Sequence, residues 1–173
     1  VWNTCMVFFQ AVLLAGYGYA HLTTAALGPR RQATLHAVIL ALPLLALPIR
    51  LPAGWTPPAM ANPIPWLLSL LLLRVGLPFF VVSTSAPLLQ RWFAATNHPS
   101  ARDPYFLYAA SNLGSLLALL SYPVLVEPFL TLPAQSGVWA AGYGVLVGLT
   151  GGCAYVLRRS PTALTQPTNV PVA

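Results

Sequence analysis

The chain has 173 residues, of which 57% are hydrophobic and only 6% are charged. Soluble domains carry roughly 25% charged residues, so this composition excludes a water-soluble globule and indicates a membrane protein. The net charge of +6 comes from arginines scattered singly or in pairs between apolar runs, which is typical of membrane-protein loops, and we expect no nucleic-acid partner.

Five apolar runs are long enough to cross a bilayer core of about 30 Å, which takes about 20 helical residues. They cover residues 2–21, 33–49, 64–84, 104–126 and 136–157. We therefore expect an all-α bundle of about five transmembrane helices over residues 1–158, followed by a cytoplasmic extended tail over residues 159–173. The second run is short and carries Pro43 and Pro48, which predict a kink.

The arginines also indicate an orientation. The loops after the first, third and fifth runs carry six of them, whereas the opposite side receives only Arg50. Because cytoplasmic loops are enriched in Lys and Arg, we expect the amino end outside and the carboxyl tail in the cytoplasm. The six are Arg30, Arg31, Arg91, Arg102, Arg158 and Arg159.

The segment after the third run, residues 86–98, reads APLLQRWFAATNH. Pro87 suits a first helical turn, and apolar residues including Trp92 recur on one face, with Arg91 on the other. This pattern predicts a short interfacial helix along the cytoplasmic surface. We expect Arg91 and Trp92 to contact lipid or a partner protein.

Small residues spaced four apart are typical of the faces on which membrane helices pack. Such rows could pack inside the bundle or dock another subunit, and the sequence favours the internal role. The last run carries the longest row: Ala140, Gly144, Gly148 and Gly152. Shorter rows are Gly16 with Ala20, Gly114 with Ala118, and Ser111 with Ser115.

Arg74 lies about ten residues into the third run, which is about 15 Å at 1.5 Å per residue. A charge near the bilayer midplane costs at least about 2.5 kcal/mol, so it needs partners or a function. The antiparallel fourth run places Ser111, Asn112 and Ser115 at a comparable depth. We predict a structural polar clamp between these residues and Arg74; the alternative is an anion or headgroup site.

No set of residues indicates catalysis or a metal. The two acids, Asp103 and Glu127, lie at helix ends, and the sequence has no Gly-rich phosphate loop, metal-ligand spacing or Ser/His/Asp set. We predict that the chain is not an enzyme and needs no cofactor. Lipid contact is compatible with the pattern, and His21 or His36 could contact a pigment, although no motif specifies one.

Three stretches resemble the bacterial membrane proteins described as fused transporter-like/spermidine synthase proteins: VWNTCMVFFQAVLLAGYGYAHL, GLPFFVVSTSAPLLQRWFAAT and RDPYFLYAASNLGSLLALLSYPVLVEP. The resemblance covers about residues 1–158 and implies a membrane module of the bacterial inner membrane. Members typically carry one more helix before this point and a Rossmann-like aminopropyltransferase domain after it. The catalytic residues of that domain have no matching positions here, so its activity is not carried over.

These observations favour a non-catalytic membrane subunit within a larger complex, for which an energy-transducing or photosynthetic assembly is one home. We expect its partners to be membrane lipids and other membrane subunits. One alternative is a transport module related to the major facilitator class, although five helices cannot form two inverted-repeat halves. Another is the membrane anchor of a separate polyamine-synthase-like enzyme.

Overall fold

The computed structural model describes residues 1–50, 54, 62–96, 98–103 and 105–159, and within them the chain forms helices and no strands. Four helical segments are long and apolar enough to cross a membrane. The expected all-α membrane architecture is therefore confirmed, whereas the count of five helices is not. The predicted tail, apart from Arg159, lies outside the described residues. The four segments are Trp2–Leu45, Pro63–Ala94, Tyr105–Phe129 and Leu132–Arg159.

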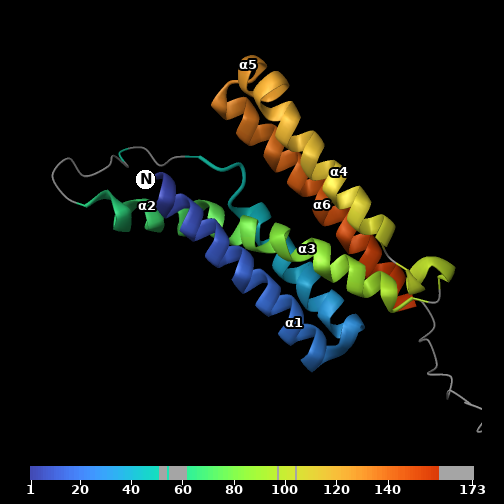
Figure 1. The fold of residues 1–173 in the computed structure, drawn as a ribbon. Coiled ribbons are helices and arrows are strands. Elements are labelled where there is room, and N and C mark those ends of the chain that lie inside the picture. Colours follow the sequence, from blue (N-terminus) through green and yellow to red (C-terminus); the bar gives the residue numbers. More distant parts are fainter. Residues whose placement is uncertain (51–53, 55–61, 97, 104, 160–173) are drawn as a thin grey trace, which may run out of the picture.

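The first segment consists of α1 (Trp2–Ala41) and the 3-10 helix η1 (Leu42–Leu45), and it reverses direction within α1. Gly28 lies inside α1 with φ 71° and ψ 166°, a left-handed conformation that glycine adopts at little cost. Pro29 follows it, and proline suits the start of a helix because its missing N–H is not needed there. Figure 1 shows the two arms of α1 running back along each other from this turn.

The second segment joins α2 (Pro63–Leu71), the π-helix η2 (Leu72–Gly76) and α3 (Leu77–Ala94). The Asn62 side chain caps its start by accepting a 3.0 Å hydrogen bond from the backbone N–H of Ile64. Pro78 has no N–H to donate to the carbonyl of Arg74, and the π-turn lies directly before this gap in the ladder.

The separate interfacial helix expected around Pro87 is not present, and this prediction is wrong. Pro87 lies inside α3, which continues without a break to Ala94. The apolar face of this segment packs against protein, because Leu88 and Trp92 are only 1% and 2% exposed. They form one buried cluster with residues of both arms of α1 and of α6 (Leu132–Arg159): Ala20, Ala33, Ala154 and Leu157.

The last helix, α6, packs along the second arm of α1 and against α3. Tyr143 donates a 2.8 Å hydrogen bond from its hydroxyl to the carbonyl of Leu40, and the Ser136 hydroxyl donates to the carbonyl of Ile49 at 2.6 Å. Tyr143 also packs with Leu40 and Val81 in a second buried cluster. These contacts place α6 antiparallel to that arm.

A helical hairpin leads into α6 through η3 (Pro99–Arg102), α4 (Tyr105–Ser121), the π-helix η4 (Tyr122–Val126) and α5 (Glu127–Phe129). No residue of α4 is buried. Its most extensive helix contact is with η4, which directly follows it, while Phe106 packs edge-on against Phe93 of α3. Figure 1 shows α4 and α6 diverging from α2 and from the start of α1.

α1 and α3 lie in close contact at Gly16, which is buried. A Cβ atom added there would lie 2.6 Å from Ser83 Oγ and 3.1 Å from Thr84 Cγ2, whereas one added at Gly18 would meet nothing within 4 Å. The short row of Gly16 and Ala20 is thus an internal packing face, as the sequence predicts.

We expect Gly16→Leu to lower the free energy of unfolding by about 1–3 kcal/mol, because overpacking forces α1 and α3 apart. Gly18→Leu is the matched control on the same arm and should leave stability within about 0.5 kcal/mol. Both values can be measured by denaturant titration in mixed micelles. Equal losses in the two variants would show that close approach at Gly16 is not the cause.

Candidate functional site

The side-chain amide of Gln32 is completely buried on the second arm of α1 and has four hydrogen-bond partners. Its Nε2 donates towards the carbonyl of Ala20 at 3.1 Å and towards the hydroxyls of Thr23 and Thr24 at 2.7 Å each. Its Oε1 accepts a 3.3 Å hydrogen bond from the indole N–H of Trp92. One amide therefore joins both arms of α1 to α3.

The two threonines can accept these bonds because their own protons are engaged elsewhere. Thr23 Oγ1 donates to the carbonyl of Tyr19 at 2.7 Å, and Thr24 Oγ1 donates to the carbonyl of Ala20 at 2.6 Å. Each hydroxyl thus keeps its lone pairs free for the Gln32 amide. The polar network is closed, which suits a low-dielectric interior where an unpaired polar group is costly.

His36 lies one turn beyond Gln32 and is 1% exposed. Its ring packs between Tyr19 and Trp92, with centroid separations of 6.0 and 5.9 Å. Both ring nitrogens and the Tyr19 hydroxyl are buried without a hydrogen-bond partner, as is Thr150 Oγ1 on α6. The described residues form no group of three or more His, Cys, Asp or Glu that could hold a metal ion.

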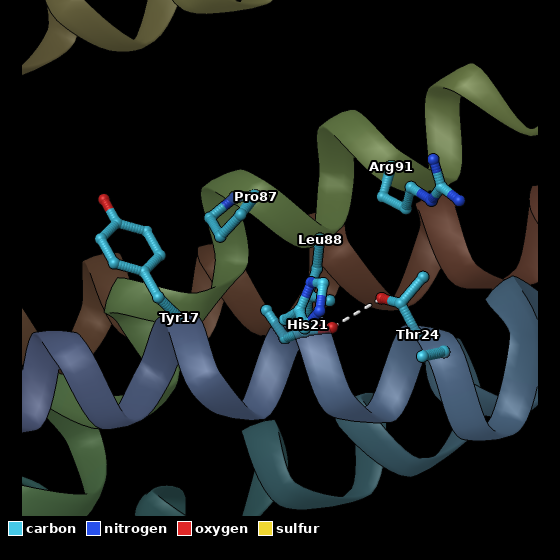
Figure 2. Close-up of a pocket in the computed structure, with 8 residues that line it drawn as sticks. Tyr17, His21, Thr24, Pro87, Leu88 and Arg91 are labelled. Atoms are coloured by element: carbon cyan, nitrogen blue, oxygen red, sulfur yellow. Dashed lines mark hydrogen bonds between the residues drawn. The ribbon is translucent and has the colours of Figure 1, made fainter.

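A groove with a volume of about 440 Å³ lies between the first arm of α1 and α3 (Figure 2). Small and apolar residues form much of its wall, and four residues carry polar groups. Neither of the two acidic residues lines it. The lining residues are Tyr17, Ala20, His21, Thr24, Ala25, Pro87, Leu88 and Arg91.

The first arm of α1 presents Tyr17, His21 and Thr24 to this groove because these residues recur at helical spacing of four and three. Figure 2 shows His21 near the middle of the groove, with Tyr17 and Arg91 towards opposite ends. Arg91 is exposed, and its guanidinium forms no hydrogen bond or ion pair with any residue that the structure describes. The groove therefore carries an uncompensated positive charge.

The predicted clamp around Arg74 is not formed. Arg74 lies in η2, whose close neighbours are α2 and α3, and no hydrogen bond among the described residues joins it to the fourth run. Ser111, Asn112 and Ser115 are all exposed on α4. The prediction rested on depth alone, and α4 diverges from the α2–η2 region (Figure 1).

The row on α6 faces away from the packed interior. Gly144, Gly148 and Gly152 are exposed with nothing within 4 Å of an added Cβ, and Ala140 is partly exposed. The buried face of α6 instead carries Tyr143, Thr150, Ala154 and Leu157. The internal packing role that the sequence favours for this row is therefore wrong.

Arg91 and Trp92, expected together at a lipid or partner surface, lie on different faces of α3. Arg91 is exposed beside the groove, whereas Trp92 is buried and bonded to Gln32. The expectation for Trp92 is wrong because its face of the helix packs on α1 and α6. His21 lines the groove, while the buried ring of His36 offers no surface for a pigment to approach.

Sequence reasoning singled out neither Gln32 nor the Tyr17–His21–Thr24 face. An uncharged amide four residues after Gly28, with two threonines on the preceding arm, is the signal that could have indicated a bonded hairpin. The chain matches no protein-family model, no curated protein and no solved structure.

We expect Gln32→Leu to lower the free energy of unfolding by about 1–3 kcal/mol, because it leaves the buried indole N–H of Trp92 without an acceptor. Gln10→Leu, at an exposed position of the first arm of α1, is the matched control and should change stability little. Denaturant titration in mixed micelles, followed by tryptophan fluorescence, measures both. Equal stability of the two variants would show that the amide does not hold the hairpin.

Proposed function

We propose that the chain is a non-catalytic integral membrane subunit that packs against another membrane protein through α4 and the glycine row of α6. The exposure of α4 supports this proposal most directly, because none of its residues is buried. In lipid, helices associate through van der Waals contact between closely approaching backbones. A helix with few close contacts in its own chain leaves most of its packing surface for a second protein.

The glycine row supplies the complementary feature. Exposed glycines let a partner backbone approach closely, and the open space above Gly144, Gly148 and Gly152 is free of atoms of this chain. The composition of α4, with many exposed large apolar side chains such as Leu113, Leu116 and Leu120, also suits contact with another helix or with lipid. An energy-transducing or photosynthetic complex is one assembly that could contain such a subunit.

The same proposal includes a topology of five crossings. The segment Trp2–Leu45 crosses twice, because its two arms fold back at Gly28 and remain joined by the Gln32 amide. The second arm and η1 span about 25 Å at 1.5 Å per residue, so the bilayer thins locally around them. With Arg30 and Arg31 beside the turn, the amino end lies outside a bacterial inner membrane and the carboxyl end in the cytoplasm.

Two alternative functions are compatible with the same transmembrane bundle. The resemblance to the transporter-like/synthase proteins supports a membrane anchor for a separate polyamine-synthase-like enzyme. A transport module related to the major facilitator class requires a substrate path between two repeated halves. Isolation of the protein from its native membrane in mild detergent distinguishes these outcomes: a membrane-protein complex supports the proposed subunit, and a co-purifying soluble synthase supports the anchor.

We expect Gly148→Leu to abolish co-purification of the partner complex while the chain still inserts and keeps its stability, because a Cβ added at Gly148 would meet no other helix or side chain within 4 Å. Gly142→Leu is the matched control: Gly142 is also exposed with open space around it, but lies on another face of α6. The readouts are complex size by blue native electrophoresis and stability in mixed micelles. Retention of the complex by Gly148→Leu, or equal loss in both variants, contradicts this docking surface.

A further inference from the structure

The groove between the first arm of α1 and α3 has the chemistry of an amphiphile site. Its polar groups come from Tyr17, His21, Thr24 and Arg91, and its wall between them is formed by small or apolar residues. The positive charge of Arg91 has no counter-charge, since the groove lining includes no acidic residue. An anion that also carries an apolar tail satisfies both features.

The two ends of the groove lie at different distances from the turn at Gly28, and these distances correspond to the headgroup layer and the acyl-chain region of a bilayer. Thr24 is four residues from the turn at Gly28, which is about 6 Å along the helix, whereas Tyr17 is about 16 Å from it. A headgroup layer is about 5–8 Å thick on each side of the hydrocarbon core. With the turn at the membrane surface, the Thr24 end lies at headgroup depth and the Tyr17 end lies among acyl chains.

The arginine of the groove lies towards the headgroup end. Arg91 belongs to the last turn of α3, and Figure 2 shows it beyond Leu88, on the Thr24 side of the groove. The turn of α1 carries Arg30 and Arg31, which do not line the groove. A basic residue that contacts the headgroup of an anionic lipid contributes on the order of 1 kcal/mol, or about a fivefold change in affinity.

We propose that this groove binds the phosphate-bearing headgroup of an anionic phospholipid, with Arg91 and His21 as its polar contacts and one acyl chain along Pro87 towards Tyr17. The open, apolar wall favours a lipid over free phosphate, which has no use for a hydrophobic surface. The bound lipid covers the outer side of the contact between Ala20 and Leu88, next to the Gln32 network. The bound lipid fills the groove between α1 and α3.

The test compares binding of phosphatidylglycerol and phosphatidylcholine to the purified full chain in neutral detergent, by native mass spectrometry. We expect phosphatidylglycerol to bind several-fold more tightly, and Arg91→Gln to weaken its binding about fivefold. Arg31→Gln, which removes an exposed arginine outside the groove, is the matched charge control and should leave binding within about twofold. Arg91→Lys should retain most of the affinity.

A second pair of variants tests the groove without changing charge. Ala25→Phe fills the groove and should weaken phosphatidylglycerol binding, whereas Ala26→Phe, at an exposed position outside the lining, should not. This pair keeps the test decisive even if Arg91→Gln fails to fold. Millimolar inorganic phosphate should not displace the lipid.

Three results would overturn the proposal. Equal binding of the two phospholipids excludes recognition of a negative charge. Equal weakening by Arg91→Gln and Arg31→Gln indicates attraction by the basic end as a whole and not a built groove. Displacement of the lipid by inorganic phosphate identifies a free-anion site in place of a lipid site.

Discussion

The buried amide of Gln32 is the interaction on which the arrangement of the bundle depends. It bonds to the first arm of α1 at Ala20, Thr23 and Thr24, and to Trp92 of α3. Interhelical hydrogen bonds in membranes contribute on average only about 0.6 kcal/mol each, so their value lies mainly in fixing register. Here they fix the reversal at Gly28 and the position of α3 together. Because Trp92 is also part of the central apolar cluster, the polar and apolar contacts support the same packing.

This packed centre consists of α1, α3 and α6, and the remaining features follow from what it leaves outside. The close approach at Gly16 brings α1 onto α3, and Tyr143 draws α6 against the second arm. The described residues of α4, η4 and α5 include no buried residue. The groove beside Arg91 borders the Gln32 network, with which it shares Ala20 and Thr24. Both proposed contacts, with a partner helix and with a lipid, use surfaces that remain exposed after the helices of this chain have packed together.

The positions of the helices were largely predictable from the sequence, whereas the face of each helix that packs against its neighbours was not. Long apolar runs specify helices because a bilayer requires every backbone polar group to be bonded within the segment. Gly28 and Pro29 lie between the first two predicted runs, so the reversal was anticipated in outline. The structure differs in continuing α1 up to the turn and α3 through Pro87. Proline did not end that helix, because the residues after it are held by buried contacts.

The candidate site was harder to predict because depth in a membrane does not specify direction around a helix axis. Arg74 and Asn112 lie at comparable depth by residue count, but their helices face different neighbours. Gly148 shows the same limit: its glycine row indicates a face suited to helix packing, but not whether a helix of this chain or of another protein packs there. Trp92 was predicted from its amphipathic pattern to contact lipid or a partner protein, although such a pattern equally suits a face buried within the chain itself. Gln32 carried the stronger signal, since a buried amide requires partners wherever it points.

The central claim is that the segment Trp2–Leu45 is a hairpin that enters and leaves the membrane on one side. Impermeant maleimide labelling in sealed cells tests it, with Cys5 and Cys153 replaced by serine and single cysteines introduced as Asn3→Cys, Ala26→Cys and Ala46→Cys. All three positions are exposed in the structure. We predict labelling of positions 3 and 46 from outside and of position 26 only after permeabilisation. Labelling of positions 3 and 46 from opposite sides would show a single crossing and would contradict the account.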